Sequence, residues 1–288
     1  MRSSLSGRPD LPDSLSGTAG KAAWSSKVAW IAGRDYAHRG LHGPGVPENS
    51  MAAIRAAIAR GMGIECDIQR SGDGHAVVFH DRELDRLTAQ TGLVARRSAD
   101  QLGAIRLTGG GETIPRLRDV LRLVDGQAPI LIEIKSGKGQ RVAPLCLAVR
   151  RDLEGYRGHH AVMSFDPRVP RWFRDHSPRT VRGLVVSEGD QPTLLDRIRR
   201  TLAFRHARPD FLACDVRDLP SRFTRRQRRR GLPVATWTVD RPAFRMLAAR
   251  HADAAIVEGG GLENGGVESG AVESDGDLPP SAPAGTRA

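Results

Sequence analysis

Short apolar runs alternate with helical patterns along most of the 288-residue chain, and this alternation strongly constrains the fold. The apolar runs predict strands over residues 35–38, 63–69, 76–80, 130–134, 160–165, 182–186, 211–215, 233–238 and 254–257. The patterns between them predict helices over residues 50–60, 116–124, 139–152, 168–176, 192–203, 219–230 and 241–250. Repeated strand–helix units without a glycine-rich dinucleotide motif favour a TIM (β/α)8 barrel, which commonly uses about 250 residues. The sequence therefore predicts one barrel over residues 28–259.

The predicted strands outnumber the eight places of a barrel by one, so one strand must pair differently. Only "RSGDGH" joins residues 63–69 to residues 76–80, whereas a parallel crossover needs about a dozen residues or more. These two strands are therefore expected to form an antiparallel hairpin. A turn at Gly72-Asp73 would place Glu65 opposite His80, and a turn at Asp73-Gly74 would place Asp67 there. Residues 83–114 show no strong period and are expected to form a small insertion after the 76–80 strand.

Composition excludes several classes of protein. With 39% hydrophobic and 27% charged residues, the chain has no stretch of the ~18 apolar residues that a membrane span requires. Residues 1–27 and 260–288 are rich in Ser, Gly, Pro and acidic residues, so both are expected to be disordered tails. The N-terminus lacks the apolar core of a secretory signal, so a cytoplasmic location is expected. Three cysteines, Cys66, Cys146 and Cys214, are expected to be reduced and buried.

The charge is unevenly distributed. The chain carries +11, but residues 251–288 hold seven acids and one arginine, which leaves +17 on residues 1–250. Such a body attracts anions: phosphorylated metabolites, an anionic membrane surface or nucleic acid. The six arginines of "SRFTRRQRRRG", residues 221–231, are interpreted as the solvated face of an amphipathic helix with Phe223 turned inward. Nucleic acid is a less favoured partner because no stacking aromatics interleave with the arginines. Weak contact with an anionic membrane stays open, and the sequence indicates no oligomeric state.

Acidic residues interrupt two apolar strands. Glu65 and Asp67 share one face of "GIECDIQ", and Glu133 and Lys135 share one face of "LIEIK", because successive strand residues point to opposite sides. Buried charges must be paired or must hold a metal. Three converging carboxylates suit one hard divalent cation, Mg²⁺ or Ca²⁺, and zinc fits less well without a Cys/His cluster at ligand spacing. For any single acid, a salt bridge to a barrel Lys or Arg is the alternative.

Two histidines end predicted strands, where the active sites of barrels are built. His38 precedes a tight glycine turn, and His80 closes the 76–80 strand. Such a pair can supply one base and one acid near neutral pH, and Arg39 and Lys135 add positive charge that suits a phosphate. The site is therefore interpreted as one that cleaves a phosphodiester. The remaining histidines are expected to have surface or packing roles: His42, His75, His159, His160, His176, His206 and His251.

Six motifs occur in the order found in glycerophosphodiester phosphodiesterases, and the chain resembles that family over about residues 35–257. The motifs are "HRG…PENS", "ECDIQRSGDGHAVVFHD", "IPRLRDVL", "LIEIK", "MSF" and "WTVD". The resemblance implies a TIM barrel with a short insertion, a divalent ion on Glu65, Asp67 and Glu133, and catalysis by His38 and His80. It also implies attack of a glycerol hydroxyl on phosphorus, a cyclic phosphate, and release of glycerol 3-phosphate and an alcohol. By analogy with the family, His38 is assigned as base and His80 as acid.

The loop after the first strand then receives supporting roles. Arg39 would contact phosphate, and Glu48 and Asn49 would hold the loop and its arginine, while Asn49 or Ser50 starts the following helix. Phe165 in "MSF" and Trp237 in "WTVD" end strands on the same rim, where they would form an apolar wall against the glycerol or lipid portion. Plain barrel packing is the alternative for Trp237. "DAAIVEGGG" departs from the family, which often has an Asp-Gly start and an acid-plus-Pro finish there.

The leading hypothesis is a metal-dependent hydrolase of deacylated phospholipids such as glycerophosphocholine or glycerophosphoethanolamine. A lysophospholipase D type activity is an alternative if the rim is apolar and open enough for one acyl chain. A non-catalytic binder of anionic lipid or nucleic acid, acting through the arginine helix, is the alternative from another class.

Overall fold

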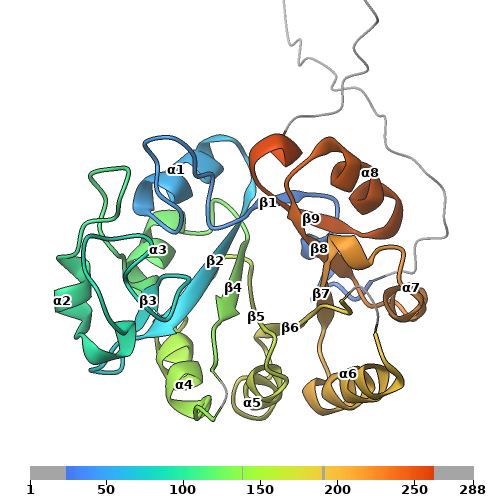
Figure 1. The fold of residues 1–288 in the computed structure, drawn as a ribbon. Helices are drawn as coiled ribbons and strands as arrows, with labels where there is room; N and C mark the ends of the chain where they lie inside the picture. The colour runs from blue at the N-terminus through green and yellow to red at the C-terminus, as the bar shows by residue number, and fades with distance from the viewer. Residues whose placement is uncertain (1–23, 138, 190–191, 263–288) are drawn as a thin grey trace, which may run out of the picture.

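The computed structural model describes residues 24–137, 139–189 and 192–262, and its strands close into a barrel (Figure 1). The strands are β1 (Asp35–Ala37), β2 (Gly63–Arg70), β3 (Ala76–Val78), β4 (Ile130–Ile134), β5 (His160–Ser164), β6 (Val181–Val186), β7 (Phe211–Asp215), β8 (Val234–Val239) and β9 (Ala254–Val257). Their order in the sheet is β1-β9-β8-β7-β6-β5-β4-β2-β3, and an additional parallel pairing of β1 with β2 closes the ring. The predicted TIM (β/α)8 barrel is therefore confirmed, with β3 outside the ring.

Helices follow the strands and pack around the outside of the barrel (Figure 1). They are α1 (Met51–Ala59), α2 (Ala99–Gly103), α3 (Leu117–Val124), α4 (Ala143–Asp152), α5 (Arg168–His176), α6 (Leu194–Ala207), α7 (Arg222–Arg229) and α8 (Pro242–His251). Short 3-10 turns lie at Ala29–Ile31, Val94–Arg96, Val216–Asp218 and Gly259–Leu262. Each helix after a strand returns the chain to the opposite end of the barrel, so all the carboxyl ends of the parallel strands meet at one rim.

Two aromatic rings fill the interior of the barrel near the amino ends of its strands. Tyr36 and Phe211 are fully buried, and a side chain at Gly63 or Gly183 would collide with the Tyr36 and Phe211 rings respectively. Small residues on neighbouring strands thus make room for large ones, as close packing in a barrel requires. With this end packed, the polar groups of the interior lie towards the other end.

The segment before β1 closes the amino end of the barrel. Val28 and Ile31 are buried in the same core cluster as Tyr36, and Trp24 and Trp30 pack against that cluster. The Tyr36 hydroxyl donates to the Ile31 carbonyl (3.2 Å). Lys27 forms an ion pair with Asp210 at 2.9 Å, so residues 24–27 belong to the fold and not to the predicted tail.

The hairpin of β2 and β3 forms as expected, but its register is neither of the two predicted ones. Ile68 pairs with Val78, and the Phe79 amide donates to the Asp67 carbonyl. Three residues, 72–74, separate the paired Ser71 and His75, where two were expected, and Gly74 adopts the left-handed φ of 91°. His80 therefore stands opposite neither Glu65 nor Asp67 in the hairpin ladder.

The insertion after β3 has a core of its own. Leu84, Val94, Leu102 and Ile114 are buried, and together they cover the Val77–Phe79 side of β3. The α2 helix begins with a capping box at Ser98, which satisfies its first amide groups. Residues 83–114 are thus a small packed unit that extends the barrel beside β2 (Figure 1).

Other expectations concern the thiols, membrane spans and tails. Cys66, Cys146 and Cys214 are free and buried, as predicted. Among the described residues, the helices are too short and too polar to cross a membrane. Of the predicted tails, residues 1–27 and 260–288, the parts at residues 1–23 and 263–288 lie outside the described residues, and residues 260–262 belong to the last 3-10 turn.

We predict that Ile31→Ala lowers the free energy of unfolding by about 2–4 kcal/mol, because it leaves a cavity in the core that closes the barrel. Urea denaturation followed by circular dichroism measures the change. Leu194→Ala removes the same kind of surface from a side chain that is 74% exposed, and should change stability by less than about 0.5 kcal/mol. Equal effects in the two variants would contradict a structural role for the segment before β1.

Candidate active site

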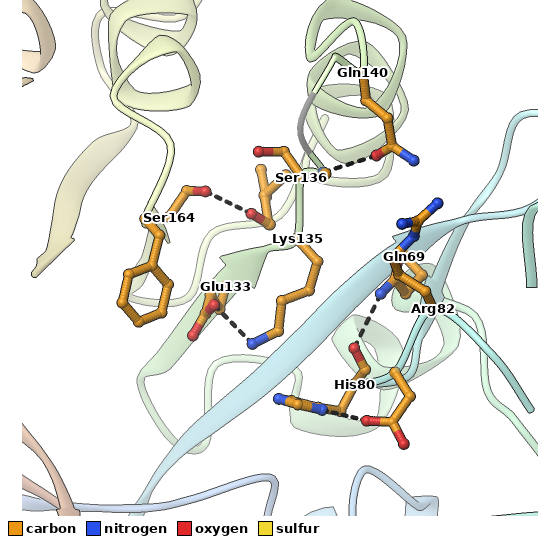
Figure 2. Close-up of a pocket in the computed structure, with 12 residues that line it drawn as sticks. Gln69, His80, Arg82, Glu133, Lys135, Ser136, Gln140 and Ser164 are labelled. Carbon is orange, nitrogen blue, oxygen red and sulfur yellow. Dashed lines mark hydrogen bonds and ion pairs between the residues drawn. The ribbon is translucent and has the colours of Figure 1, made fainter. Parts of the chain in front are cut away.

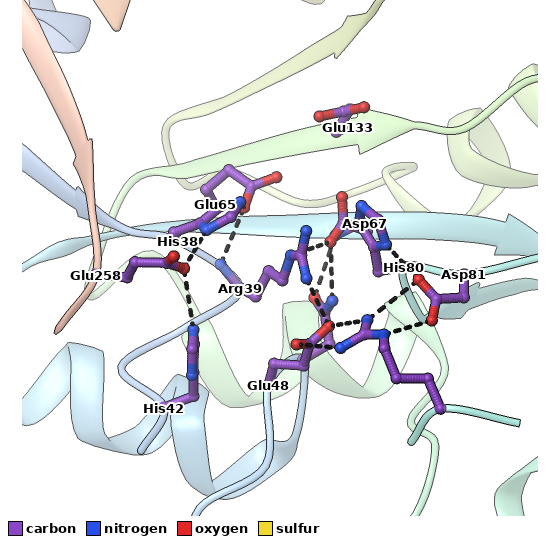
Figure 3. Close-up of polar contacts among 12 residues, drawn as sticks. His38, Arg39, His42, Glu48, Glu65, Asp67, His80, Asp81, Glu133 and Glu258 are labelled. Atoms are coloured by element: carbon purple, nitrogen blue, oxygen red, sulfur yellow. Dashed lines mark hydrogen bonds and ion pairs between the residues drawn. The ribbon is translucent and has the colours of Figure 1, made fainter. Parts of the chain in front are cut away.

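Three carboxylates meet inside the barrel near the carboxyl ends of its strands. Glu65 and Asp67 lie on β2, and Asp67 is the register partner of Glu133 on β4. They are only 1%, 1% and 8% exposed, and one oxygen from each lies within 4.8 Å of the others (Figure 3). Parallel pairing places Asp67 level with Glu133, and Glu65 lies two residues earlier on the same face of β2. The structure thus brings together the three residues that the strand pattern selected.

Positive side chains offset part of this negative charge. The Lys135 ammonium lies 2.7 Å from Glu133 and 2.8 Å from Asp67 (Figure 2 shows the Glu133 contact), and the Arg39 guanidinium lies 3.3 Å from Asp67. Burial lowers the pKa of Lys135, but the charges of Asp67 and Glu133 outweigh this effect and raise it. Burial raises the pKa of Asp67, but Lys135, His80 and Arg39 outweigh this effect and hold it below its usual value. Salt bridges, the alternative foreseen for a single acid, therefore do exist for Asp67 and Glu133.

Glu65 forms no ion pair with a Lys or Arg side chain of the described residues, and the only basic side chain that reaches it is that of His38, at 4.0 Å. Its Oε2 accepts the Arg39 amide at 2.9 Å, while its buried Oε1 has no hydrogen-bond partner among the described residues. Burial raises the pKa of Glu65 well above its usual value, and the charges of Asp67 and Glu133 add to this rise. An unpartnered buried oxygen beside two further carboxylates is the oxygen-rich environment that a hard divalent cation fits. We therefore regard these three residues as a candidate metal centre.

The loop between β1 and α1 carries two non-glycine residues in the left-handed region, Arg39 (φ 55°) and Asn49 (φ 58°). Left-handed backbone costs such residues on the order of 1 kcal/mol each and collects at functional sites. Asn49 holds β2 through bonds to the Asp67 carboxylate (2.9 Å) and amide (3.2 Å). Gly40 lies so close to α1 that a Cβ atom would stand 2.8 Å from Ala53. Ser50, not Asn49, caps the helix, by accepting the Ala53 amide.

A carboxylate orients His38. The Nδ1 atom of His38 lies 2.6 Å from Glu258, which follows β9, and its Nε2 atom lies 4.0 Å from Glu65 (Figure 3). His42 also reaches Glu258, at 3.4 Å, so it lies next to the site, although the sequence predicted only a surface or packing role for it. The hydrogen bonds from His38 and His42 lower the pKa of Glu258 strongly. With Nδ1 held by Glu258, the other ring nitrogen of His38 faces the carboxylates.

A second carboxylate orients His80 in the same way. The Nδ1 atom of His80 lies 2.6 Å from Asp81, and Arg86 donates to both Asp81 (2.6 Å) and Glu48 (2.8 Å). Burial would raise the pKa of Asp81, but hydrogen bonds from Arg86 and His80 lower it to about 2. Glu48 also accepts from Arg39 at 2.8 Å. A continuous chain of charged groups thus runs from His80 to Arg39 along the edge of the site (Figure 3).

A cavity of about 350 Å³ opens beside these groups (Figure 2). Its walls include His80, Glu133, Lys135, Ser136, Gln140 and Phe165. Phe165 is 49% exposed and makes an edge-to-face contact with Trp237, with ring centroids 5.4 Å apart. Trp237 contacts Phe165 but is not among the residues that line this cavity, and its wall role and its packing role both stay predictions.

Four residues around the site are missing from the sequence-based set: Glu258, His42, Asp81 and Arg86. A positional signal exists for Glu258 and Asp81, because each follows a predicted strand on the rim where barrel sites are built. Arg86 belongs to the insertion and His42 to a loop, and neither position has a pattern that ties it to the carboxylates.

Comparison with known proteins agrees with this geometry. The model of the glycerophosphoryl diester phosphodiesterase family matches residues 38–259. The chain belongs to this family. It is 40% identical over 111 residues to a glycerophosphodiester phosphodiesterase of Caldanaerobacter subterraneus subsp. tengcongensis, a match that covers 35% of this chain but only 44% of that relative. It is 29% identical over 225 residues to the probable glycerophosphodiester phosphodiesterase 2 of Mycobacterium tuberculosis, covering 72% of this chain and 79% of the relative.

Solved structures show the same fold. A phosphodiesterase of Oleispira antarctica, solved in complex with the product sn-glycerol-3-phosphate, superposes with a TM-score of 0.68 at 23% identity over 78% of this chain and 93% of that one. A glycerophosphodiester phosphodiesterase of Thermotoga maritima gives a TM-score of 0.62 at 25% identity, over 77% of this chain and 92% of the other. The chain thus shares its overall fold with these solved structures.

Proposed function

We propose that the protein hydrolyses glycerophosphodiesters to glycerol 3-phosphate and an alcohol, with one divalent cation, Mg²⁺ or Ca²⁺, on Glu65, Asp67 and Glu133. The observation that carries the proposal is the cluster of three buried carboxylates with an oriented imidazole on either side. Such a bound cation stabilises the negative charge that develops on the phosphate oxygens during displacement. Family membership and the names of the curated relatives support the reaction class.

His38 is the proposed base of the first half-reaction. Glu258 holds Nδ1, so Nε2 is the free ring nitrogen that can take the proton from the glycerol hydroxyl next to the phosphate. The hydroxyl oxygen then bonds to phosphorus, and the bond from phosphorus to the departing alcohol breaks. Arg39 and Lys135 supply fixed positive charge along the phosphate during this step.

His80 is the proposed acid. Asp81 holds its Nδ1, and its ring lines the cavity, from which it can deliver a proton to the oxygen of the departing alcohol. The roles reverse when water opens the cyclic phosphate: His80 takes the proton of the attacking water, and His38 returns its proton to the glycerol oxygen. Both imidazoles end in their starting states, so the cycle is balanced.

We predict that His38→Ala and His80→Ala each lower kcat by at least about 100-fold, because each removes a positioned proton-transfer group. Release of glycerol 3-phosphate from glycerophosphocholine, coupled to its dehydrogenase, measures the rate. His176→Ala changes an exposed imidazole on α5 and serves as the control. Near-normal turnover in either test variant, with an unchanged melting temperature, would remove that histidine from the mechanism.

We predict that chelation of divalent cations abolishes turnover and that Mg²⁺ or Ca²⁺ restores it. Glu65→Gln keeps the side-chain shape but removes one anionic ligand, so it should weaken cation binding by more than about tenfold. Isothermal titration calorimetry with each cation measures this, and Glu154→Gln at an exposed position is the control. Activity that survives complete metal removal would refute the assignment of the carboxylates.

We predict that Glu258→Gln lowers kcat by about 10-fold to 100-fold and leaves KM nearly unchanged, because a neutral amide no longer fixes the His38 ring and its tautomer. Steady-state kinetics on glycerophosphocholine separates the two constants. Glu258→Asp keeps the carboxylate and should recover part of the loss. If Glu258→Gln and Glu258→Asp were both as active as the parent protein, Glu258 would not be a positioning residue.

A further inference from the structure

Helix α6 presents apolar side chains to solvent. Leu194, Leu195, Ile198 and Leu202 are 74%, 52%, 48% and 58% exposed. They make up four of the six large hydrophobic residues that are exposed in the described parts of the chain. Exposed apolar patches of this kind on a protein surface mark contacts with other molecules.

These four side chains form one continuous face. At about 100° per residue they span an arc of roughly 100°, and Leu194, Ile198 and Leu202 follow each other at intervals of four. The opposite side of the helix faces the barrel: Ala207 is buried, and Phe204 and Arg200 contact Phe223 of α7. Helices of a barrel ordinarily turn their apolar face inward. In α6 a second apolar face, away from the barrel, has no contact with the described core.

Basic residues border this face and extend over the neighbouring helix. Arg197, Arg199 and Arg205 are exposed on α6. Its one acidic residue, Asp196, serves in the capping box with Thr193. Helix α7 lies beside α6 (Figure 1), with the Phe204 and Phe223 rings 5.7 Å apart. Its exposed arginines, which make no ion pair within the described ranges, are Arg222, Arg225, Arg226, Arg229 and Arg230.

We propose that α6 and α7 form a peripheral membrane-binding surface for an anionic lipid bilayer. The apolar face of α6 enters the boundary between headgroups and acyl chains, and the arginines of both helices contact anionic headgroups. A surface helix with an apolar face flanked by basic residues is the arrangement that binds membrane interfaces, and clustered arginines add attraction to anionic lipid. The arginine run of residues 221–231, which the proposed hydrolysis does not use, thereby gains a role.

A bilayer fits this surface better than a second copy of the chain. In a twofold dimer the same patch meets itself, so the arginines on the borders of the two α6 helices would be brought together. Like charges placed opposite each other weaken such a contact. Anionic headgroups neutralise the same arginines, and the acyl region accepts the apolar side chains without any complementary protein shape.

Sedimentation of the full chain with lipid vesicles tests the proposal. The protein should sediment with vesicles of phosphatidylglycerol and phosphatidylcholine, and much less with vesicles of phosphatidylcholine alone. Ile198→Glu with Leu202→Glu should reduce binding to the anionic vesicles by at least about tenfold. Met246→Glu changes an equally exposed apolar residue, 61% exposed on α8, and should leave binding unchanged.

A second pair of variants tests the basic part of the surface. Arg225→Glu with Arg229→Glu should weaken binding by at least about tenfold, whereas Arg55→Glu with Arg60→Glu, an equal change of charge at exposed positions on and after α1, should change it little. All variants should keep the melting temperature and the turnover of soluble glycerophosphocholine. If the α6 variant is less stable, Ile198→Gln with Leu202→Gln replaces it, and if the α7 variant is less stable, Arg225→Gln with Arg229→Gln replaces it.

Two outcomes would overturn the proposal. One is a parent protein that does not sediment with the anionic vesicles. The other is a pair of α6 variants that converts a dimer into a monomer in analytical ultracentrifugation while vesicle binding stays at the parent level, because the apolar face would then belong to an interface between copies. Loss of turnover in His38→Ala without loss of vesicle binding keeps the two proposals separate.

Discussion

The crowding of three carboxylates inside the barrel is the constraint on which the rest of the site depends. One oxygen from each of Glu65, Asp67 and Glu133 lies within 4.8 Å of the others, where like charges repel strongly because little water screens them. Lys135 and Arg39 offset the charge of two of these groups. Glu65 keeps a raised pKa and an unpartnered oxygen. Such an arrangement is unfavourable as packing, and a divalent cation, as proposed, would provide the missing positive charge.

Holding these groups together requires the whole ring of strands. The pairing of β2 with β4 sets Asp67 against Glu133, and the closure of β1 between β2 and β9 brings Glu258 to His38 across 220 positions of sequence. The buried aromatic rings and the segment before β1 fill the barrel at the amino ends of its strands. Rigid packing there keeps the backbone from relaxing in response to the repulsion among the carboxylates at the carboxyl ends. The tightly packed residues that support the barrel and the carboxylates of the candidate site thus lie towards opposite ends of the barrel axis.

Local patterns in the sequence were enough to predict the ring and the inner half of the site. Alternation along β2 and β4 selected Glu65, Asp67 and Glu133, and a loop too short for a crossover identified the hairpin. The register of that hairpin could not be predicted, because Gly72 and Gly74 each permit a turn and only the packed structure selects a three-residue one. Arg86 and His42 reach the site through loop geometry, which leaves no periodic trace. The exposure of the apolar face of α6 could not be predicted either, because the spacing of apolar residues does not show whether they face the barrel or the solvent.

The two proposals share one geometry. In a barrel every helix that follows a strand begins at the carboxyl end of the strands, so Leu194, the first residue of α6, lies on the side of the rim, and Leu202 lies about two turns further along the helix. A bilayer that accepted this face would lie along the flank of the barrel, with the rim near the headgroups. The net charge of +17 on residues 1–250 attracts the anionic headgroups of such a surface. Under the two proposals, the basic body and the apolar flank would concentrate one class of molecule, and the acidic centre would cleave it.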